Sequence, residues 1–352
     1  MKKTKRIIYL FVIIFSLAVN PLLSQPMNNY KIHLVSETSI FSSADFEACH
    51  SSTIVEISPD TLMAAWFAGS HEGANDVGIW ISNYTNKTWS APKEIVKGYD
   101  SLGNQLPCWN PVLFKTNDNK LVLFYKVGPN PREWWGCAVQ SIDNGISWSK
   151  SIKLPEGFLG PIKNKPLQLT NGKIFCPSSV ETTDGEWSTH LEICDNNLST
   201  WEKIKIQKDD SVGVIQPTII KHNNGKFQML CRSKQNVIYE TWSKNDGFTW
   251  SELKPSKLPN PNSGIDAVSL HNGKFILVYN PLLSGNDWWN GRNVLNAAVS
   301  DDGQNWINIY QLENEMDGEF SYPAVIQASD NSIHITYTNK RKTIKHVVLK
   351  LD

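Results

Sequence analysis

The chain of 352 residues is 40% hydrophobic and 11% aromatic, and its acidic and basic residues balance to a formal net charge of zero. This composition supplies enough apolar surface for a large core, and an all-β fold of this length often forms one domain. A neutral chain without a basic cluster is not expected to bind nucleic acid. Its six cysteines are too sparse for a disulfide scaffold and fit no zinc motif, so we expect small buried side chains with one bridge at most, no metal site and no cofactor.

Residues 1–24 have the pattern of a secretory signal peptide. Basic residues at positions 2, 3, 5 and 6 precede the apolar run 7–19, which is short for a membrane span. An uncleaved anchor helix is the alternative because the run is strongly apolar, whereas a lipid anchor is not expected because no Cys directly follows Ser24. We therefore expect residues 25–352 to form one exported domain, periplasmic or secreted, without stable membrane insertion after cleavage.

Six pairs of apolar segments follow, and a short polar turn separates the two members of each pair. Asn, Asp and Gly in these turns are typical of β-hairpins. The predicted hairpins span residues 52–67, 112–125, 167–177, 218–232, 268–279 and 324–337. A further apolar segment follows each hairpin.

A second repeat alternates with the hairpins and ends in a Trp. Residues 141–148 read Ser-Ile-Asp-Asn-Gly-Ile-Ser-Trp. Copies lie at residues 243–250 and 299–306, and degenerate copies lie at residues 82–89 and 194–201. Asp and Asn side chains bond their own backbone in such turns, Gly accepts a positive φ, and the Trp can cover the turn. We interpret Asp143 and Asp301 as turn-forming residues rather than catalytic ones.

Together the two repeats place four strands in each unit of about fifty residues, which is the organisation of a propeller blade. Six units predict an all-β fold, a six-bladed β-propeller over roughly residues 40–350. The last unit has no Trp-ended turn and its strand 343–351 ends the chain, so we expect residues 28–36 to supply its outer strand and close the ring. In this topology, the starts of the innermost strands and the loops after the second strands share one rim, where ligands are expected. The Trp-ended turns lie at the opposite rim.

Alignment of the six hairpins on their first apolar residues brings polar residues to the propeller axis at the ligand rim. They are His50, Asn110, Lys165, Gln216, Asp266 and Tyr322. This convergence indicates a binding site. A water-filled channel mouth lined by solvated groups is the alternative.

The loops of the same rim contribute charged residues and two Trp pairs. The residues that we single out there are Glu72, Asp76, Arg132, Trp135, Arg232, Trp289 and Arg292. In an exported protein this combination suits a sugar, since flat rings cover the apolar faces of sugars while charged groups fix hydroxyls or a carboxylate. One member of each Trp pair is expected to pack inside its blade instead.

The Trp-ended turn resembles the Asp-box, or BNR repeat, of sialidases, and the resemblance extends over nearly the whole mature chain. It implies a sialidase-like propeller with three arginines that clamp a substrate carboxylate, a tyrosine nucleophile activated by a glutamate, and an aspartic acid on a loop of the first blade. Arg232 and Arg292 look like the second and third arginines. Tyr322, in a Phe-Ser-Tyr-Pro stretch, looks like the nucleophile, and Asp76 or Glu72 lies on the loop that carries the acid.

Two positions depart from the family pattern. The residues around His50 read Ala-Cys-His-Ser where the first arginine stands in the family, and Gln216 replaces the glutamate. A tyrosine without its carboxylate partner is a poor nucleophile, because the pKa of a free phenol is about 10. Weak cleavage of sialosides is therefore expected, and another acidic sugar is the alternative substrate.

The resemblance implies an exo-acting glycoside hydrolase for a terminal, acidic sugar. Asp76 or Glu72 would protonate the leaving oxygen while the two arginines hold an anionic group. Tyr322 would act as the nucleophile or stabilise the transition state. The axial residues His50 and Asp266 could supply the missing base.

Two other functions fit the same residues. In a polysaccharide lyase, His50 or Tyr322 would remove the proton beside a uronate carboxylate. Arg232, Arg292 or Lys165 would neutralise that carboxylate. In a glycan-binding propeller, the same residues would bind a sugar without turnover. In each case the expected partner is a carbohydrate, and we expect a monomer.

Overall fold

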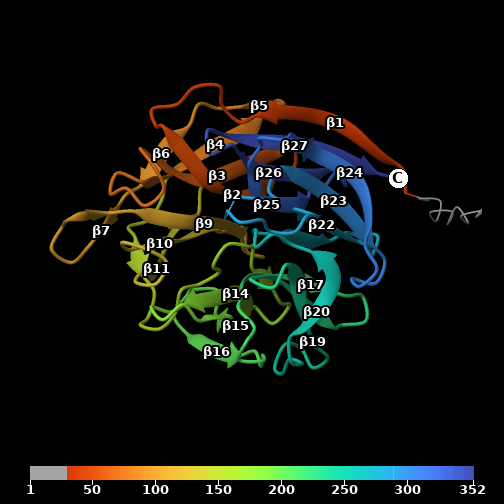
Figure 1. The fold of residues 1–352 in the computed structure, drawn as a ribbon. Helices are drawn as coiled ribbons and strands as arrows, with labels where there is room; N and C mark the ends of the chain where they lie inside the picture. The colour runs from red at the N-terminus through yellow and green to blue at the C-terminus, as the bar shows by residue number, and fades with distance from the viewer. Residues whose placement is uncertain (1–29, 288) are drawn as a thin grey trace, which may run out of the picture.

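The computed structural model describes residues 30–287 and 289–352, and these residues form six four-stranded or five-stranded antiparallel sheets arranged in a ring (Figure 1). Blade 1 contains β2 (Ala48–Ser58), β3 (Thr61–Gly69), β4 (Gly78–Thr85), β5 (Thr88–Trp89) and β6 (Lys93–Val96). Blade 2 contains β9 (Cys108–Lys115), β10 (Leu121–Val127), β11 (Trp135–Ser141) and β12 (Ile152–Lys153). Blade 3 contains β13 (Leu167–Gln168), β14 (Ile174–Glu181), β15 (Trp187–Cys194) and β16 (Trp201–Lys205).

The second half of the ring repeats this arrangement. Blade 4 contains β17 (Val214–Lys221), β18 (Phe227–Ser233), β19 (Val237–Ser243) and β20 (Lys254–Pro259). Blade 5 contains β21 (Asp266–Ser269), β22 (Phe275–Tyr279), β23 (Val294–Ser300) and β24 (Ile307–Asn314). Blade 6 contains β25 (Phe320–Gln327), β26 (Ile333–Asn339), β27 (Thr343–Leu351) and β1 (Ile32–Ser39). The all-β, six-bladed propeller predicted from the sequence is confirmed.

The ring is closed by strands from the two ends of the described chain. β1 is the first described strand, and it pairs antiparallel with β27, the last one. Closure by an N-terminal strand is as predicted, although the strand covers 32–39 rather than 28–36. The predicted signal peptide, residues 1–24, lies outside the described residues. Within the described part of the chain, no helix has the length and apolar character to cross a membrane.

The core lies between the faces of neighbouring blades. Phe67 and Ile79 of blade 1 pack in one cluster with Leu123 and Tyr125 of blade 2. β10 is buried along its whole length. Strands buried on both faces require continuous apolar runs, and this is why the inner hairpins stand out in the sequence. A short hairpin, β7 (Gly98–Tyr99) with β8 (Gln105–Leu106), projects from the edge of the ring.

The Trp-ended turns have the hydrogen bonds that their sequence predicts. Ser141 Oγ donates to Asp143 Oδ1 at 2.7 Å, and the same Asp143 oxygen accepts from the backbone N–H of Ser147 at 2.9 Å. Gly145 has a φ of 84°, and a Cβ there would collide with Met63. The Asp of this turn is therefore structural.

The third copy of the turn corrects one prediction. Asp302, not Asp301, accepts from Ser300 Oγ at 3.0 Å and from the backbone N–H of Asn305 at 2.8 Å. Two residues separate Ser300 from Gly303, whereas three separate Ser141 from Gly145. The Asp that forms the turn is therefore the residue directly before the Gly. Asp301 instead binds Lys274 at 2.6 Å. Since Lys274 follows the β21–β22 hairpin turn, the Trp-ended turns lie at the hairpin end of the blades, as predicted.

The cysteines are the small buried side chains that the sequence predicts. All six are buried and all six are free thiols, so the single bridge left open by the sequence does not form. They act as small apolar residues in the blade interfaces.

A buried chain of hydrogen bonds connects blade 6 to blade 1. Trp89 Nε1 donates to His346 Nδ1 at 3.1 Å, His346 and His334 share a hydrogen bond of 2.9 Å, and His334 contacts Ser332 Oγ at 2.7 Å. Because the indole can only donate, His346 must accept at Nδ1 and donate at Nε2. Burial lowers the pKa of His334 to about 4 and that of His346 to about 3.

The histidine chain predicts acid sensitivity. Below pH 6.5 the unfolded chain binds protons at these histidines, whereas the folded chain does not until about pH 4. The free energy of unfolding should therefore fall as the pH falls through this window, with a contribution from His334 of about 3 kcal/mol. Denaturant unfolding at pH 7 and pH 4.5 measures it. His334→Gln should show a smaller fall, and the exposed control His271→Gln should match the parent. Equal slopes in all three proteins would contradict the prediction.

Candidate functional site

Four inner strands begin with a β-bulge that directs a side chain toward the axis. Blades 1, 2, 4 and 6 skip a register position near the start of the inner strand. The residue inside each bulge has a positive φ, namely Ser51 (58°), Asn110 (36°), Gln216 (55°) and Tyr322 (52°). This conformation costs a non-glycine residue on the order of 1–2 kcal/mol, and strain of this kind concentrates at functional sites.

The bulges also correct the alignment of blade 1. The sequence placed His50 in register with Gln216 and Tyr322, but the structure places Ser51 there. His50 pairs with Phe67 just before its bulge, as Ser321 pairs with Thr338 before the bulge at Tyr322. Blades 2, 4 and 6 carry a Pro after the bulged residue, whereas blade 1 has Ser52, so no proline marks the position of the bulge in blade 1.

Tyr322 lies at the centre of the site. Its Oη accepts hydrogen bonds from Gln216 Nε2 and from Arg232 Nη1, both at 2.9 Å. Arg232 Nη1 also donates to Gln216 Oε1 at 3.1 Å, and its Nε donates to Asn262 Oδ1 at 2.7 Å. The two donors stabilise negative charge on the phenol oxygen. Among the described residues, no carboxylate forms a hydrogen bond to this oxygen.

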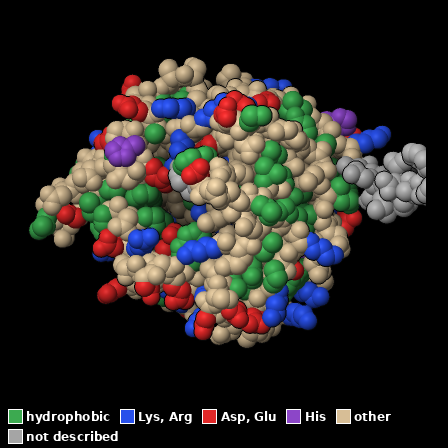
Figure 2. All heavy atoms as spheres, viewed as in Figure 1, with side chains coloured by type: hydrophobic (Ala, Val, Ile, Leu, Met, Phe, Trp, Pro, Cys, Tyr) green, Lys and Arg blue, Asp and Glu red, His purple; other side chains and the backbone are tan. Residues whose placement is uncertain are grey.

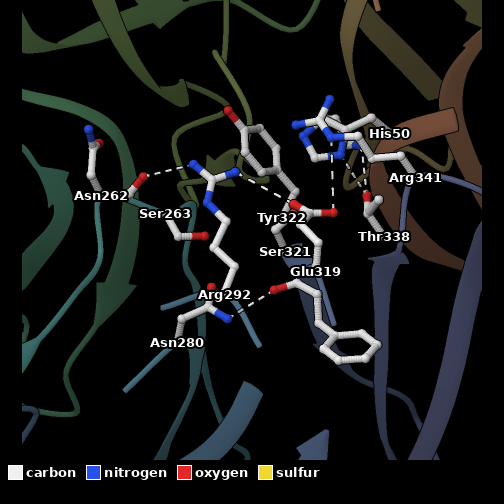
Figure 3. A network of polar contacts seen from close by, with 12 residues as sticks. His50, Asn262, Ser263, Asn280, Arg292, Glu319, Ser321, Tyr322, Thr338 and Arg341 are labelled. Atoms are coloured by element: carbon white, nitrogen blue, oxygen red, sulfur yellow. Dashed lines mark hydrogen bonds and ion pairs between the residues drawn. The ribbon is translucent and has the colours of Figure 1, made fainter. Parts of the chain in front are cut away.

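Two further arginines lie near Tyr322, and Figure 3 shows them on opposite sides of its ring. Arg292 Nη2 donates to the backbone oxygen of Asn262 at 3.0 Å, and its Nη1 lies 3.6 Å from Glu319 Oε1. The Arg341 Nε lies 4.0 Å from the other oxygen of Glu319. Burial, and then the charge of Arg232, lower the pKa of Arg292 to about 10, so it stays charged at neutral pH. Glu319 thus holds two guanidinium groups beside Tyr322.

Arg341 is a site residue that the sequence analysis missed. It lies in the turn between β26 and β27, and its backbone oxygen accepts from the N–H of Cys49 at 2.9 Å. It therefore sits beside the Ala-Cys-His-Ser stretch in which the first arginine was expected and not found. The loops after second strands were assigned to the ligand rim, and this turn is the corresponding loop of blade 6. Applying that rule to it would have identified Arg341.

His50 packs against Tyr322 in the buried part of the site. The two ring centroids are 4.2 Å apart, and His50 Nδ1 forms a 2.9 Å hydrogen bond with Thr338 Oγ1. Burial, followed by the charges of Arg341 and Arg292, holds the pKa of His50 well below its usual range. The imidazole is therefore neutral at neutral pH.

Lys163 is a buried residue next to Tyr322 that was not predicted from the sequence. It is buried, and its Nζ donates to Asn164 Oδ1 at 2.8 Å, to the backbone oxygen of Ile265 at 3.0 Å and to that of Pro323. The Nζ lies 5.7 Å from the centroid of the Tyr322 ring. Burial lowers its pKa to about 7. Since Pro323 belongs to the bulge, Lys163 stabilises the strained backbone that positions Tyr322.

Asp266 and Lys165 form an ion pair at the axis, and four groups donate hydrogen bonds to the Asp266 carboxylate. The Asp266 carboxylate accepts from Lys165 Nζ at 2.8 Å, from Thr218 Oγ1 at 2.8 Å, and from the backbone N–H groups of Ala267 and Val325, both at 2.9 Å. The structure thus brings Asp266 to the axis, as expected, but its hydrogen bonds connect blades 3, 4, 5 and 6 rather than reaching Tyr322. Asn110 is also buried and accepts from Lys126 through its backbone oxygen at 3.4 Å.

The two candidate acids of the first blade have different partners. Glu72 forms an ion pair with Arg341, whereas Asp76 accepts from the backbone N–H and the Oγ of Ser70, both at 2.9 Å. Both lie on the exposed loop between β3 and β4. Because the Glu72 carboxylate is paired with Arg341, Asp76 is the better candidate for proton donation.

Of the remaining predicted residues, Arg132 and Trp135 line a separate cavity between blades 2 and 3, and Trp289 is exposed on the loop before β23. Figure 2 shows that the viewed face is hollowed near its centre and that acidic and basic side chains gather around the hollow.

Of the site residues predicted from the sequence, the structure brings together Gln216, Arg232, Arg292, Tyr322 and His50.

Sequence and structure comparisons show the family and the fold of the chain. A sequence model of the family described as "BNR repeat-like domain" matches residues 60–335. No curated protein matches the chain.

Similar solved structures include a protein of unknown function from Dyadobacter fermentans (TM-score 0.74, 15% identity, 91% of this chain and 99% of that chain). They also include the sialidase of Trypanosoma rangeli (TM-score 0.70, 16% identity, 86% of this chain and 55% of that chain). The K499G mutant of the NanB sialidase of Streptococcus pneumoniae is a third (TM-score 0.67, 13% identity, 88% of this chain and 70% of that chain). At these identities the likeness establishes the sialidase-like fold.

Proposed function

The chain belongs to the BNR repeat-like family, with the fold of the sialidase superfamily, and we propose that it is an exported glycosidase that cleaves a terminal acidic sugar from a glycan. The observation that carries this proposal is the grouping of three arginines, Arg232, Arg292 and Arg341, around Tyr322. Planar guanidinium groups bind carboxylates in a bidentate geometry. Export rests on the sequence of residues 1–24.

In this proposal the arginines hold the carboxylate of the sugar. Tyr322 loses its phenol proton to water and its oxygen bonds the anomeric carbon as the bond to the leaving oxygen breaks; water then cleaves the sugar from Tyr322 and restores the phenol. Gln216 and Arg232 stabilise the phenol oxygen as it gains negative charge. Asp76 protonates the leaving oxygen, since Glu72 is paired with Arg341. Gln216 cannot take up the phenol proton, so cleavage of simple sialosides should be weak.

One observation favours a second function, a lyase for uronic-acid glycans. Tyr322 has a neutral imidazole, His50, against its ring and no carboxylate partner among the hydrogen bonds described above. In a lyase, Tyr322 or His50 removes the proton from the carbon beside the uronate carboxylate, which the arginines neutralise. The electron pair of that C–H bond forms a C=C bond, and the bond to the leaving oxygen breaks as that oxygen is protonated.

A panel of sialosides and uronic-acid oligosaccharides tests the proposal, with reducing ends and ultraviolet absorbance followed together. We expect new reducing ends without ultraviolet absorbance, and Arg292→Ala should abolish them. New reducing ends with ultraviolet absorbance would establish the lyase instead. Binding of acidic sugars without cleavage would replace both with a glycan-binding role. Cleavage of neutral sugars only would contradict the assignment of the arginines.

A further inference from the structure

Blade 3 brings two polar residues, Lys163 and Asn164, to the axis in a way that the other blades do not. The pairing of β13 with β14 runs without a register shift, so blade 3 has no bulge in that pairing. Instead, the segment before β13 places these two side chains among blades 4, 5 and 6, where both residues are only 2% exposed. Buried polar groups at such a position must be accounted for by their hydrogen bonds.

Lys163 connects the entrance of blade 5 to the bulge of blade 6. Its Nζ donates to Asn164 Oδ1 at 2.8 Å, to the backbone oxygen of Ile265 at 3.0 Å and to the backbone oxygen of Pro323. An ammonium group has three donors and no acceptor, so these three oxygens use all of its protons. Pro323 directly follows Tyr322, the residue with positive φ in that bulge.

Asn164 extends the connection to the bulge of blade 4. Its Nδ2 donates to the backbone oxygens of Gln216 at 3.1 Å and Pro217 at 3.0 Å. Gln216 has a φ of 55°, and its Nε2 donates to Tyr322 Oη at 2.9 Å. The hydrogen bonds thus form a closed loop that runs from the backbone beside Tyr322 through Lys163 and Asn164 to Gln216 and back to the phenol.

We propose that Lys163 and Asn164 are positioning residues that hold Gln216 against Tyr322, and that they do so only while Lys163 carries its proton. The inference rests on the proposed function, because the phenol that they position is the reacting group. A neutral amine has two N–H donors and a lone pair, so one of the three oxygens would lose its partner and face that lone pair. A strained bulge is held only by its surroundings and should shift when one contact is lost.

The surroundings of Lys163 bring the loss of this proton into an accessible pH range. Burial lowers the pKa of Lys163 to about 7, the charge of Asp266 acts in the opposite direction, and the charges of Lys165 and Arg232 lower it further. The charged and titratable groups that act on Lys163 or lie beside it are Asp266, Lys165, Arg232, His50 and Tyr322. Of these, His50 is neutral at neutral pH.

Carbon-13 NMR of protein labelled at the tyrosine Cζ atoms tests the inference without a substrate. The Tyr322 signal, assigned by its absence from Tyr322→Phe, should shift in the parent with a midpoint near pH 7. In Lys163→Met this step should be absent. Asn164→Ala breaks the same loop without removing the charge, so its Tyr322 signal at pH 6 should be displaced from the parental one. Lys173→Met, which removes a surface lysine paired with Glu202 at the opposite rim, should titrate like the parent.

The pH dependence of kcat on the acidic glycan is the second measurement. Lys163→Met should lower kcat at pH 6 by about 10²-fold, since a misplacement of roughly 1 Å can cost that much. The parental kcat should fall toward that of the variant as the pH rises through 7, and Lys163→Met should lack this fall.

The outcomes separate this inference from the proposed function. A parental Tyr322 signal that does not move between pH 6 and 8, or a step that persists in Lys163→Met, would overturn the inference even if the protein cleaves an acidic glycan. If Lys163→Met does not fold, the parental titration and Asn164→Ala decide, and a parental signal in Asn164→Ala counts against the inference. If the signals behave as expected but no acidic glycan is cleaved, the positioning role stands and the proposed function fails.

Discussion

Tyr322→Phe is expected to lower kcat for the cleaved acidic glycan by about 10²- to 10⁴-fold, the usual contribution of a positioned proton-transfer or nucleophilic group. The substitution removes only the oxygen that accepts hydrogen bonds from Gln216 and Arg232. The ring, its contact with His50 and its place above Lys163 are kept. The loss should therefore fall on kcat, and the affinity for substrate should change little.

Steady-state kinetics on the parent and on two single-hydroxyl variants measures this effect. Tyr125→Phe is the matched control, because Tyr125 Oη bonds Ser151 Oγ inside blade 2, away from the arginines. It should keep the parental kcat. A kcat within threefold of the parent for Tyr322→Phe would show that the phenol takes no part in the reaction, and the chemistry would then have to be assigned to His50 or Asp76.

The architecture was predictable because it is encoded by local chemistry that repeats. Gly145, with its positive φ, and Asp143, which bonds the following backbone, mark a turn wherever the pattern occurs. The inner hairpins are marked by buried apolar runs. Counting these units gave six blades. The shorter third turn shows the limit of such counting, because one missing residue transfers the structural role from Asp301 to Asp302.

The site was predictable only where a local pattern accompanies it. Gln216 and Tyr322 precede prolines at the starts of inner strands, so their approach to the axis could be inferred. Arg341 is marked only by its place in a loop after a second strand, and Lys163 has no marker of either kind. Arg341 reaches the site through a contact with Cys49, and Lys163 through the backbone oxygen of Pro323, both distant in the sequence. Contacts of this kind depend on ring closure and on bulge geometry, which a single sequence does not display.

Arg341→Lys is expected to weaken binding of the acidic substrate by about 10- to 10³-fold, since loss of one member of a buried, hydrogen-bonded charge pair costs roughly 2–5 kcal/mol and Lys retains part of the attraction. Lys keeps the positive charge but cannot present two parallel N–H groups to a carboxylate. Arg292→Lys should weaken binding of the acidic substrate to a similar extent. The affinity for a carboxyl-reduced analogue of the same sugar should be nearly the same in parent and variants.

The ion pair between Arg341 and Glu72 provides the control that separates a carboxylate clamp from a loop anchor. Glu72→Gln leaves the arginine in place and removes the charge of its partner on the β3–β4 loop. If Arg341 binds the substrate, Glu72→Gln should bind the acidic sugar at least as well as the parent does, because Glu72 no longer offsets the charge of the guanidinium, while Glu319 stays in place. If Glu72→Gln weakens binding as much as Arg341→Lys, and both variants also lose affinity for the carboxyl-reduced analogue, Arg341 orders the loop that carries Asp76 and the clamp consists of Arg232 and Arg292 alone.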